Sequence, residues 1–228
     1  MPFNCAELFA LHFPFWDKLS EEQKKTLCNQ TSFAEYDKGA NIHGNLGNCT
    51  GAILVKSGIL RTYMLSDEGK EITLYRLYPG DICMLSASCV MQSITFDVFV
   101  DAEIKSEVYI INSGSFAKLM EENVYVENFA LKTATERFSE VMWAMQQILF
   151  MSFDRRLAVF LLDELAKEGG DTIKLTQEQI AKYMGSAREV VSRMLKYFST
   201  EGLVEVARGG VKVVDKVRLN EIAGTETK

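Results

Sequence analysis

The stretch LTQEQIAKYMGSAREVVSRMLKYFSTEGLVEVARGGVKVVD, residues 175–215, decides the fold of the C-terminal part of this 228-residue chain. Thr176 stands three residues before Gln179, which is the spacing of a capping box at the start of a helix. Apolar residues then recur at helical intervals, so the sequence predicts a helix over residues 177–184.

A turn, a second helix and a hairpin follow this first helix. Gly185 permits the tight turn that joins two helices at a steep angle, and Ser186 is expected to cap the second helix. Farther on, Arg208-Gly209-Gly210 joins the short segments LVEVA and VKVVD, a pattern typical of a β-hairpin. The order helix, turn, helix and hairpin predicts a winged helix-turn-helix.

The second helix of this motif combines an apolar stripe with a charged face. A helix has the right width for the major groove of B-DNA, where arginine pairs with guanine and glutamate accepts a hydrogen bond from cytosine. Arg188 and Glu189 stand at the helix start and Arg193 follows about one turn later, so these residues are candidates for base contacts. Ser192 and Thr176 could bind phosphates or bases. The alternative is a solvated charged face in which Glu189 and Arg193 form an i,i+4 pair.

The charge of the chain is unevenly distributed. The whole sequence has a formal net charge of −6. Residues 171–218 carry nine Lys and Arg against six Asp and Glu, a net charge of +3, so the remainder carries −9. A locally basic segment on an acidic body is what a DNA-reading domain attached to a sensor would have.

Composition excludes several other classes of protein. Hydrophobic residues make up 47% of the chain, which is enough to bury a core and excludes intrinsic disorder. No run of about eighteen apolar residues is present, so no membrane span is expected. The opening MPFNCAELFALHFPF lacks a basic start and a small-residue cleavage site, so we expect no signal peptide and a cytoplasmic protein.

The N-terminal half changes its pattern after a short helical start. Ser20 and Gln23 have capping-box spacing within a helix predicted over residues 15–30. Residues 31–111 form short runs rich in Val, Ile, Leu, Tyr and Phe, separated by turns that contain Gly, Asp or Pro. Short strands at this spacing predict an antiparallel roll or barrel.

A helical pattern resumes at Ser113 and runs long. Apolar residues recur at alternating steps of three and four, which is the heptad seam of a two-helix coiled coil. The alternative is a helix packed lengthwise on its own domain. The pattern stops near Met151, where we place the hinge, and Asp154 is expected to cap a further helix over residues 155–166. The predicted dimer seam consists of Leu131, Ala134, Phe138, Val141, Met145 and Ile148.

Three segments of the C-terminal motif closely resemble the signature of the CRP/FNR family of bacterial transcription regulators. They are Gln179-Ile180-Ala181, the run from Gly185 to Arg193, and Glu201-Gly202-Leu203-Val204. The N-terminal likeness is one of pattern rather than of ligand residues. The resemblance implies an α+β fold with an N-terminal antiparallel β-roll, a jelly roll of the cyclic-nucleotide-binding type that senses an effector. The implied domains are this roll at 1–122, a long dimerisation helix at 123–150 and the winged helix-turn-helix at 151–228.

The resemblance also implies a function. It predicts a homodimer on a palindromic double-stranded DNA site with a TGA-like half-site core, controlled allosterically by a signal received in the roll. In the family, positions matching Arg188, Glu189 and Arg193 contact bases, and Ser192 matches a base-contacting serine of the oxygen-sensing branch. RNA polymerase is a further partner if the regulator is an activator. The predicted base contacts are Arg188, Glu189, Ser192 and Arg193, and the predicted backbone contacts are Thr176, Ser186, Lys196 and Arg208.

Cyclic AMP is the first effector that the resemblance suggests. Members that bind it carry a Gly-Glu pair and then an Arg-Ser pair, for the ribose and the cyclic phosphate, whereas this chain has Met84-Leu85 and Phe96-Asp97. The pair that meets the adenine corresponds to Val141 and Met142. Because the phosphate-binding cation is missing and an aspartate stands beside the site, we expect no tight binding of cyclic AMP.

The cysteines suggest a second kind of sensing. Cys5 is alone near the N-terminus, so the chain lacks the cysteine cluster that holds an iron-sulfur centre in the oxygen-sensing branch. Cys83 and Cys89 flank the ligand segment, and His43 and Cys49 precede it. Some of these four could form a redox pair, a metal site or a haem ligand set. The alternative is that they pack as small apolar residues, and no cofactor is expected to be required for DNA binding.

A third possibility is an apolar or organic-anion effector between the roll and the long helix. Arg61, Arg76 and Arg137 are candidate cations, and Trp143 with neighbouring methionines could supply an apolar wall. Each of these residues fits surface charge or dimer packing equally well. The candidate effector pocket consists of Arg61, Leu85, Cys83, Cys89, Arg137, Val141 and Met142.

Two rival classes are less consistent with the sequence. A metalloenzyme built on a β-roll usually carries several histidines, but this chain has only His12 and His43 and no His-x-His pair. A thiol enzyme that uses Cys83 or Cys89 would need a nearby histidine base, which the sequence does not visibly supply. A sensor that binds a protein partner would leave the charged helix face unexplained. We therefore expect a regulator and not an enzyme.

Overall fold

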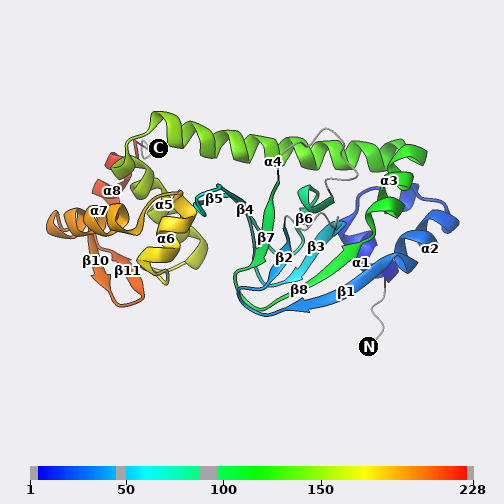
Figure 1. Cartoon of the computed structure of the whole chain (residues 1–228), viewed down its shortest axis with the longest axis horizontal. Coiled ribbons are helices and arrows are strands. Elements are labelled where there is room, and N and C mark those ends of the chain that lie inside the picture. The colour runs from blue at the N-terminus through cyan, green and yellow to red at the C-terminus, as the bar shows by residue number, and fades with distance from the viewer. Residues whose placement is uncertain (1–4, 45–49, 88–96, 225–228) are drawn as a thin grey trace. The chain divides into compact units, whose positions relative to one another are not determined.

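The protein combines helices and strands in the predicted α+β class. The computed structural model describes residues 5–44, 50–87 and 97–224 (Figure 1). None of the described helices is long and apolar enough to cross a membrane.

The chain packs as two compact units. The first consists of Met1–Leu65 and Leu74–Val141, and the second of Ser66–Thr73 and Met142–Lys228. The long helix α4 (Val124–Phe150) contributes residues to both units. The domain limits derived from the sequence remain a prediction.

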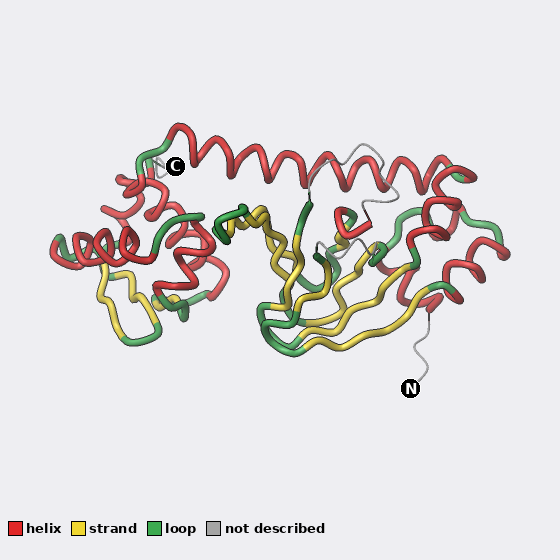
Figure 2. The backbone as a smooth tube through the Cα atoms, viewed as in Figure 1, coloured by secondary structure: helices red, strands yellow, loops and turns green. Residues whose placement is uncertain are grey.

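Most of the first unit is the predicted roll, built from two four-stranded sheets (Figure 2). One sheet has the strand order β1-β8-β3-β6 and the other β2-β7-β4-β5. Neighbouring strands are antiparallel in the pairs β1 with β8, β3 with β8, β3 with β6, β2 with β7 and β4 with β7. Side chains from both sheets form one buried cluster. The strands are β1 (Thr31–Tyr36), β2 (Asn41–His43), β3 (Ala52–Ser57), β4 (Leu60–Leu65), β5 (Glu71–Leu77), β6 (Ile82–Cys83), β7 (Phe99–Ala102) and β8 (Ser106–Ile111), with a 3-10 turn η2 (Leu85–Ala87) after β6.

The helices before the roll differ from the single predicted helix. A 3-10 turn, η1 (Trp16–Lys18), precedes α2 (Glu21–Asn29), so the helix is shorter than residues 15–30. The capping box is confirmed, because Ser20 and Gln23 exchange backbone-to-side-chain hydrogen bonds of 3.0 and 3.2 Å. A further helix, α1 (Cys5–His12), is not predicted by the sequence pattern.

Cys5 has a partner that the sequence pattern does not predict. It forms a disulfide with Cys28 near the end of α2. Two cysteines that are separated by 23 residues in the sequence are thus brought together by the packing of α1 on α2.

The helical region that begins at Ser113 consists of two helices. α3 (Ser113–Glu122) begins at the N-cap Asn112 and ends at Asn123, after which α4 runs to Phe150. The next helix, α5 (Phe153–Glu168), starts two residues before the predicted one, because Ser152 and not Asp154 occupies the N-cap position. The helical path is therefore interrupted at Met151 and Ser152, and a hinge at this position remains a prediction.

The second unit contains the predicted helix-turn-helix and hairpin around their own core. Phe198 is the largest of its fully buried side chains, and Leu157 is also fully buried. A third strand and a last helix complete the unit beyond what the sequence pattern predicts. The elements after α5 are β9 (Thr172–Ile173), α6 (Gln177–Met184), α7 (Arg188–Thr200), β10 (Val204–Ala207), β11 (Gly210–Val213) and α8 (Lys216–Ala223).

Candidate nucleic-acid interface

The first helix of the motif, α6, occupies the residues that the sequence predicts. Thr176 is its N-cap, and Gln179 closes the capping box by accepting the Thr176 N–H at 2.9 Å. The Thr176 hydroxyl accepts from the Gln179 N–H at 3.2 Å and lies 3.0 Å from the Gln179 side-chain oxygen. The hydroxyl is thus engaged in the cap, although the residue as a whole is exposed.

The turn between α6 and α7 is fixed from two sides. Gly185 has a φ of +58°, a left-handed conformation that favours glycine. The carbonyl of Met184 accepts a 2.6 Å hydrogen bond from Arg156 on α5. Ser186 is not the cap of α7 that the sequence predicts, because Ala187 occupies the N-cap position and has no side-chain hydrogen bond there. The arginine contact holds the turn where a capping side chain is missing.

Helix α7 has one buried face and one charged face. Val191, Leu195 and Phe198 are buried in the core of the unit. The predicted DNA-contacting residues fall on the opposite face, because their spacing follows the helical repeat. Of these residues, Arg188, Glu189, Arg193 and Lys196 are exposed and Ser192 is half-buried.

The charged face of α7 is not neutralised by neighbouring side chains. Among the residues that the structure describes, Arg188, Arg193 and Lys196 make no ion pair, and Glu189 does not pair with Arg193. The alternative of an internal i,i+4 pair on this face is therefore not formed. A row of unpaired donors on a helix surface favours an external acceptor.

The hairpin forms the predicted wing. β10 and β11 are antiparallel with Ala207 opposite Gly210, so Arg208 and Gly209 form a two-residue turn. Gly209 has a φ of +86°, and Arg208 is exposed at the tip. The third strand β9 pairs with β11, which connects the wing to the segment that leads into α6.

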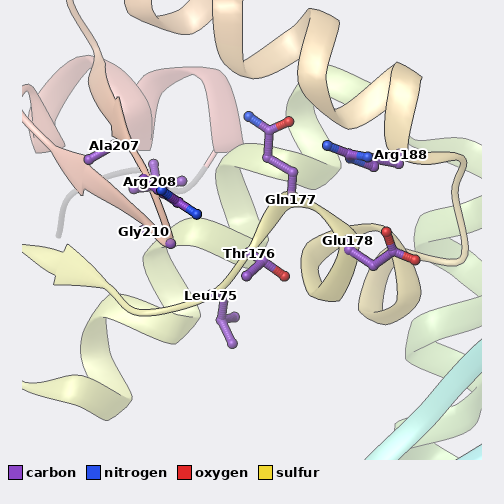
Figure 3. Close-up of a pocket in the computed structure, with 10 residues that line it drawn as sticks. Leu175, Thr176, Gln177, Glu178, Arg188, Ala207, Arg208 and Gly210 are labelled. Carbon is purple, nitrogen blue, oxygen red and sulfur yellow. The ribbon is translucent and has the colours of Figure 1, made fainter.

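A groove of about 430 Å³ lies between the wing and the start of the two helices. Figure 3 shows Gln177 in the view between Arg208, on the wing, and Arg188, at the start of α7. Two arginines from separate elements therefore line one groove together with the N-terminus of α6, whose N–H groups favour an anion. Gln177 and Glu178 were not among the predicted contacts. The lining residues are Leu175, Thr176, Gln177, Glu178, Arg188, Ala207, Arg208, Gly209, Gly210 and Val211.

The predicted effector pocket is brought together only in part. Cys83 and Leu85 are buried between the sheets of the roll, and Val141 of α4 packs against the same cluster. Arg137 lies nearby, with its guanidinium carbon 5.1 Å from the ring centre of Tyr75, another member of that cluster. Burial keeps the pKa of Tyr75 well above its ordinary value, so its phenol stays neutral.

The other predicted pocket residues lie elsewhere or outside the described residues. Arg61 is buried on β4 with its guanidinium carbon 4.4 Å from the ring centre of Tyr63, which in turn stacks on Phe99. Met142 belongs to the second unit and is exposed. Cys89 lies outside the described residues.

Two of the four metal or redox candidates can be placed. His43 is buried, and its Nδ1 lies 2.9 Å from the Thr50 hydroxyl, while Cys83 is a buried free thiol. Cys49 and Cys89 lie outside the described residues. Within the described part of the chain, no group of three potential metal ligands is present.

A winged helix-turn-helix with an unpaired basic face, joined to a β-roll, defines a DNA-binding regulator. A solved structure assigned as a transcriptional regulator of the CRP/FNR family from Eubacterium rectale ATCC 33656 has 45% sequence identity and a TM-score of 0.90, covering 94% of this chain and 100% of that one. The chain belongs to the CRP/FNR family of DNA-binding transcription regulators.

Other comparisons agree with this membership. The family model described as a Crp-like helix-turn-helix domain matches residues 155–222. The transcriptional activator protein FnrA of Stutzerimonas stutzeri is 27% identical over 82% of this chain and 78% of its own length. The cyclic AMP receptor protein of Thermus thermophilus is 24% identical over 92% of this chain and 96% of its own length.

Proposed function

We propose that this protein acts as a homodimer that places the two copies of α7 in successive major grooves of a palindromic DNA site. The observation that carries the proposal is the exposed, unpaired face of α7 beside the groove lined by Arg188 and Arg208. Binding and not covalent chemistry is the proposed activity, and the cytoplasm is its proposed location.

Specific roles follow from position along α7. Arg188 and Glu189 stand in the first turn, nearest to base edges, and Arg193 follows on the same face. We assign base contacts to Arg188, Glu189, Ser192 and Arg193, and backbone contacts to Thr176, Ser186, Lys196 and Arg208. The Thr176 hydroxyl is engaged in the cap of α6. We therefore expect the N–H groups at the start of α6, rather than this hydroxyl, to contact the DNA backbone.

The dimer interface is proposed for the apolar face of α4. Phe138 and Leu131 are 64% and 51% exposed, and Met145 and Ile148 are exposed farther along the helix. Burial of such a row against a second copy would remove a large apolar surface from water. Ala134 is half-buried and Val141 packs towards the roll, so these two predicted seam residues would lie at the edge of the interface.

The signal is proposed to enter through the roll and to reach the recognition helices through α4 and the break at Met151. Cyclic AMP does not fit the described residues, because Met84 and Leu85 are buried apolar side chains at the positions where relatives that bind it carry a Gly-Glu pair. Arg137 already faces the carboxylates of Asp81 and Glu140. We propose a small organic molecule or a redox signal as the effector, and contact with RNA polymerase if the dimer activates transcription.

Selection of bound duplexes from random DNA tests the proposal directly. We expect a palindromic motif, and we expect its affinity to fall steeply with salt while its advantage over random duplex persists. Sedimentation of the free protein should give a dimer. Binding without sequence preference, or a monomer that binds DNA equally well, would contradict the proposal.

The effector part has its own measurement. Calorimetry with cyclic AMP should give no binding at micromolar concentrations. Micromolar or tighter affinity would contradict the exclusion of cyclic AMP as the effector. It would leave the DNA-binding role intact.

A further inference from the structure

The disulfide between Cys5 and Cys28 has no place in the DNA-binding machinery. It connects the first residue of α1 to the last turn of α2, with the two Cα atoms 5.7 Å apart. Both cysteines are half-buried. Cys83, by contrast, is fully buried in the roll.

The disulfide fixes a helix that has little stability of its own. α1 contains eight residues, which is too short for an isolated helix to persist in water. It is held by Phe9, which is fully buried, by Leu8, which packs against the same cluster, and by the disulfide at its first residue. Opening the disulfide frees the N-terminal end of α1 and leaves the apolar contacts of Leu8 and of the aromatic rings to hold the helix.

Those aromatic contacts lead to the long helix. Phe13 follows α1 and stacks on Phe15, with their ring centres 4.9 Å apart. The ring centre of Phe129 on α4 lies 5.6 Å from that of Phe13 and 5.2 Å from that of Phe15. Val126 and Ala130 of α4 are buried in the same cluster. All of these residues belong to the first unit. The order of α1 is therefore coupled by packing to the first turns of α4, where the proposed dimer interface begins.

We propose that Cys5 and Cys28 form a reversible thiol-disulfide switch that responds to low-molecular-weight disulfides and raises DNA affinity in the oxidised form. The effect on DNA affinity rests on the proposed function. A DNA-binding regulator works in a reducing compartment. Disulfides there are usually transient and redox-sensing rather than structural.

The chemistry is thiol-disulfide exchange with a disulfide such as oxidised glutathione. Cys5 loses its proton and attacks one sulfur of the small disulfide, which releases one small thiolate. Cys28 loses its proton and attacks the Cys5 sulfur of the mixed disulfide, which releases the second. Two protein thiols are oxidised, one small disulfide is reduced to two thiols, and the two protons pass to the released thiolates. A small thiol reverses both steps.

The first experiment measures the chemistry in the full-length protein without DNA. The protein is equilibrated in glutathione buffers from reducing to oxidising ratios, quenched with N-ethylmaleimide and digested for mass spectrometry. We expect a linked Cys5–Cys28 peptide that appears with oxidised glutathione and disappears with reduced glutathione. Persistence of the link at every ratio, its absence at every ratio, or pairing of either cysteine with Cys49 or Cys89 would overturn the proposal.

The second experiment measures the structural effect by hydrogen exchange. Reduction opens a loop closed across 23 residues, so amides of α1 should exchange on the order of 100-fold faster. Cys5→Ser and Cys28→Ser should exchange like the reduced protein in either buffer. Cys83→Ala, which removes a cysteine outside the pair, should keep the difference. Equal exchange of α1 in both redox states would overturn the switch.

The third experiment connects the switch to DNA. With the duplex obtained by selection, we expect the oxidised protein to bind about fivefold tighter than the reduced protein, and Cys5→Ser to bind alike in both buffers. Equal affinity of the two redox forms would overturn the regulatory part. Failure of every form to prefer the selected duplex over random DNA would instead overturn the proposed function, while the thiol and exchange measurements would still decide the switch itself.

Discussion

The guanidinium of Arg137 lies 3.2 Å from the carboxylate of Asp81, so an ion pair joins helix α4 to the turn before β6. Asp81 also accepts the Tyr78 N–H at 2.8 Å, and Arg137 makes two contacts of 2.9 and 3.0 Å with Glu140. The Arg137 side chain is only 14% exposed, which limits screening by water. The contact between roll and helix is thus electrostatic as well as apolar.

Arg137→Ala should lower the free energy of unfolding by about 1–3 kcal/mol, because it leaves a partly buried carboxylate without its partner. Denaturant titration measures this change. Lys118→Ala is the matched control, since its pair with Glu122 on α3 is exposed and should be worth less than about 0.5 kcal/mol. Equal losses in the two variants would show that the Arg137 pair contributes no more than a surface pair.

Arg188→Ala and Arg208→Ala should separate base reading from backbone binding. Loss of a bidentate base contact should cost about 1–3 kcal/mol at one base pair of the half-site and relax the preference there. Loss of a phosphate contact at the wing should lower the affinity for all duplexes alike. It should also reduce the slope of log affinity against log salt concentration by about one. Binding of single-mismatch duplexes at several salt concentrations distinguishes the two. A uniform loss with Arg188→Ala would make that residue a phosphate contact.

Phe138→Asp should dissociate the dimer, because it places a charge at the centre of the apolar face of α4. We expect the dimer dissociation constant to rise about 100-fold, which corresponds to about 2.7 kcal/mol. Sedimentation equilibrium gives this constant. Glu136→Lys also changes charge on an exposed part of α4 but lies away from the seam, and it should leave the constant within about threefold of the original. A dimer unaffected by Phe138→Asp would move the interface elsewhere.

His43 should make the stability of the first unit depend on pH. Burial lowers the pKa of His43, and the nearby Asp97 offsets only part of that effect. The unfolded chain therefore binds the proton more tightly, so the free energy of unfolding should fall as pH drops from about 7.5 to 5.5. Denaturant titration across that range tests this expectation. His43→Gln should flatten the dependence, and an unchanged slope would assign it to other groups.

The motif at the centre of the interface was readable from sequence because its signals are local. Thr176 and Gln179 set the start of α6, and Gly185 marks its end through a conformation that other residues adopt with strain. The error at Ser186 is of a different kind. A residue able to cap was present, but its backbone N–H bonds to the Ala181 carbonyl and it lies one position too early in the chain.

The elements that the sequence pattern misses depend on contacts far along the chain. α1 reads CAELFALH, in which apolar residues surround the helix and no single face stands out, and only Phe9 is fully enclosed. The two-residue strand β9 exists because β11 lies beside it. The pairing of Cys5 with Cys28 likewise follows from helix packing, since spacing alone leaves the connectivity of five cysteines open.

The length of α4 has a mechanical consequence. Its 27 residues form a rod of about 40 Å, so a tilt of about 5° at one end displaces the other end by about 3.5 Å. That displacement is close to the rise of one base pair, about 3.4 Å. A small rearrangement at one end of α4 is therefore amplified by the length of the helix into a displacement of about one base-pair step at its other end.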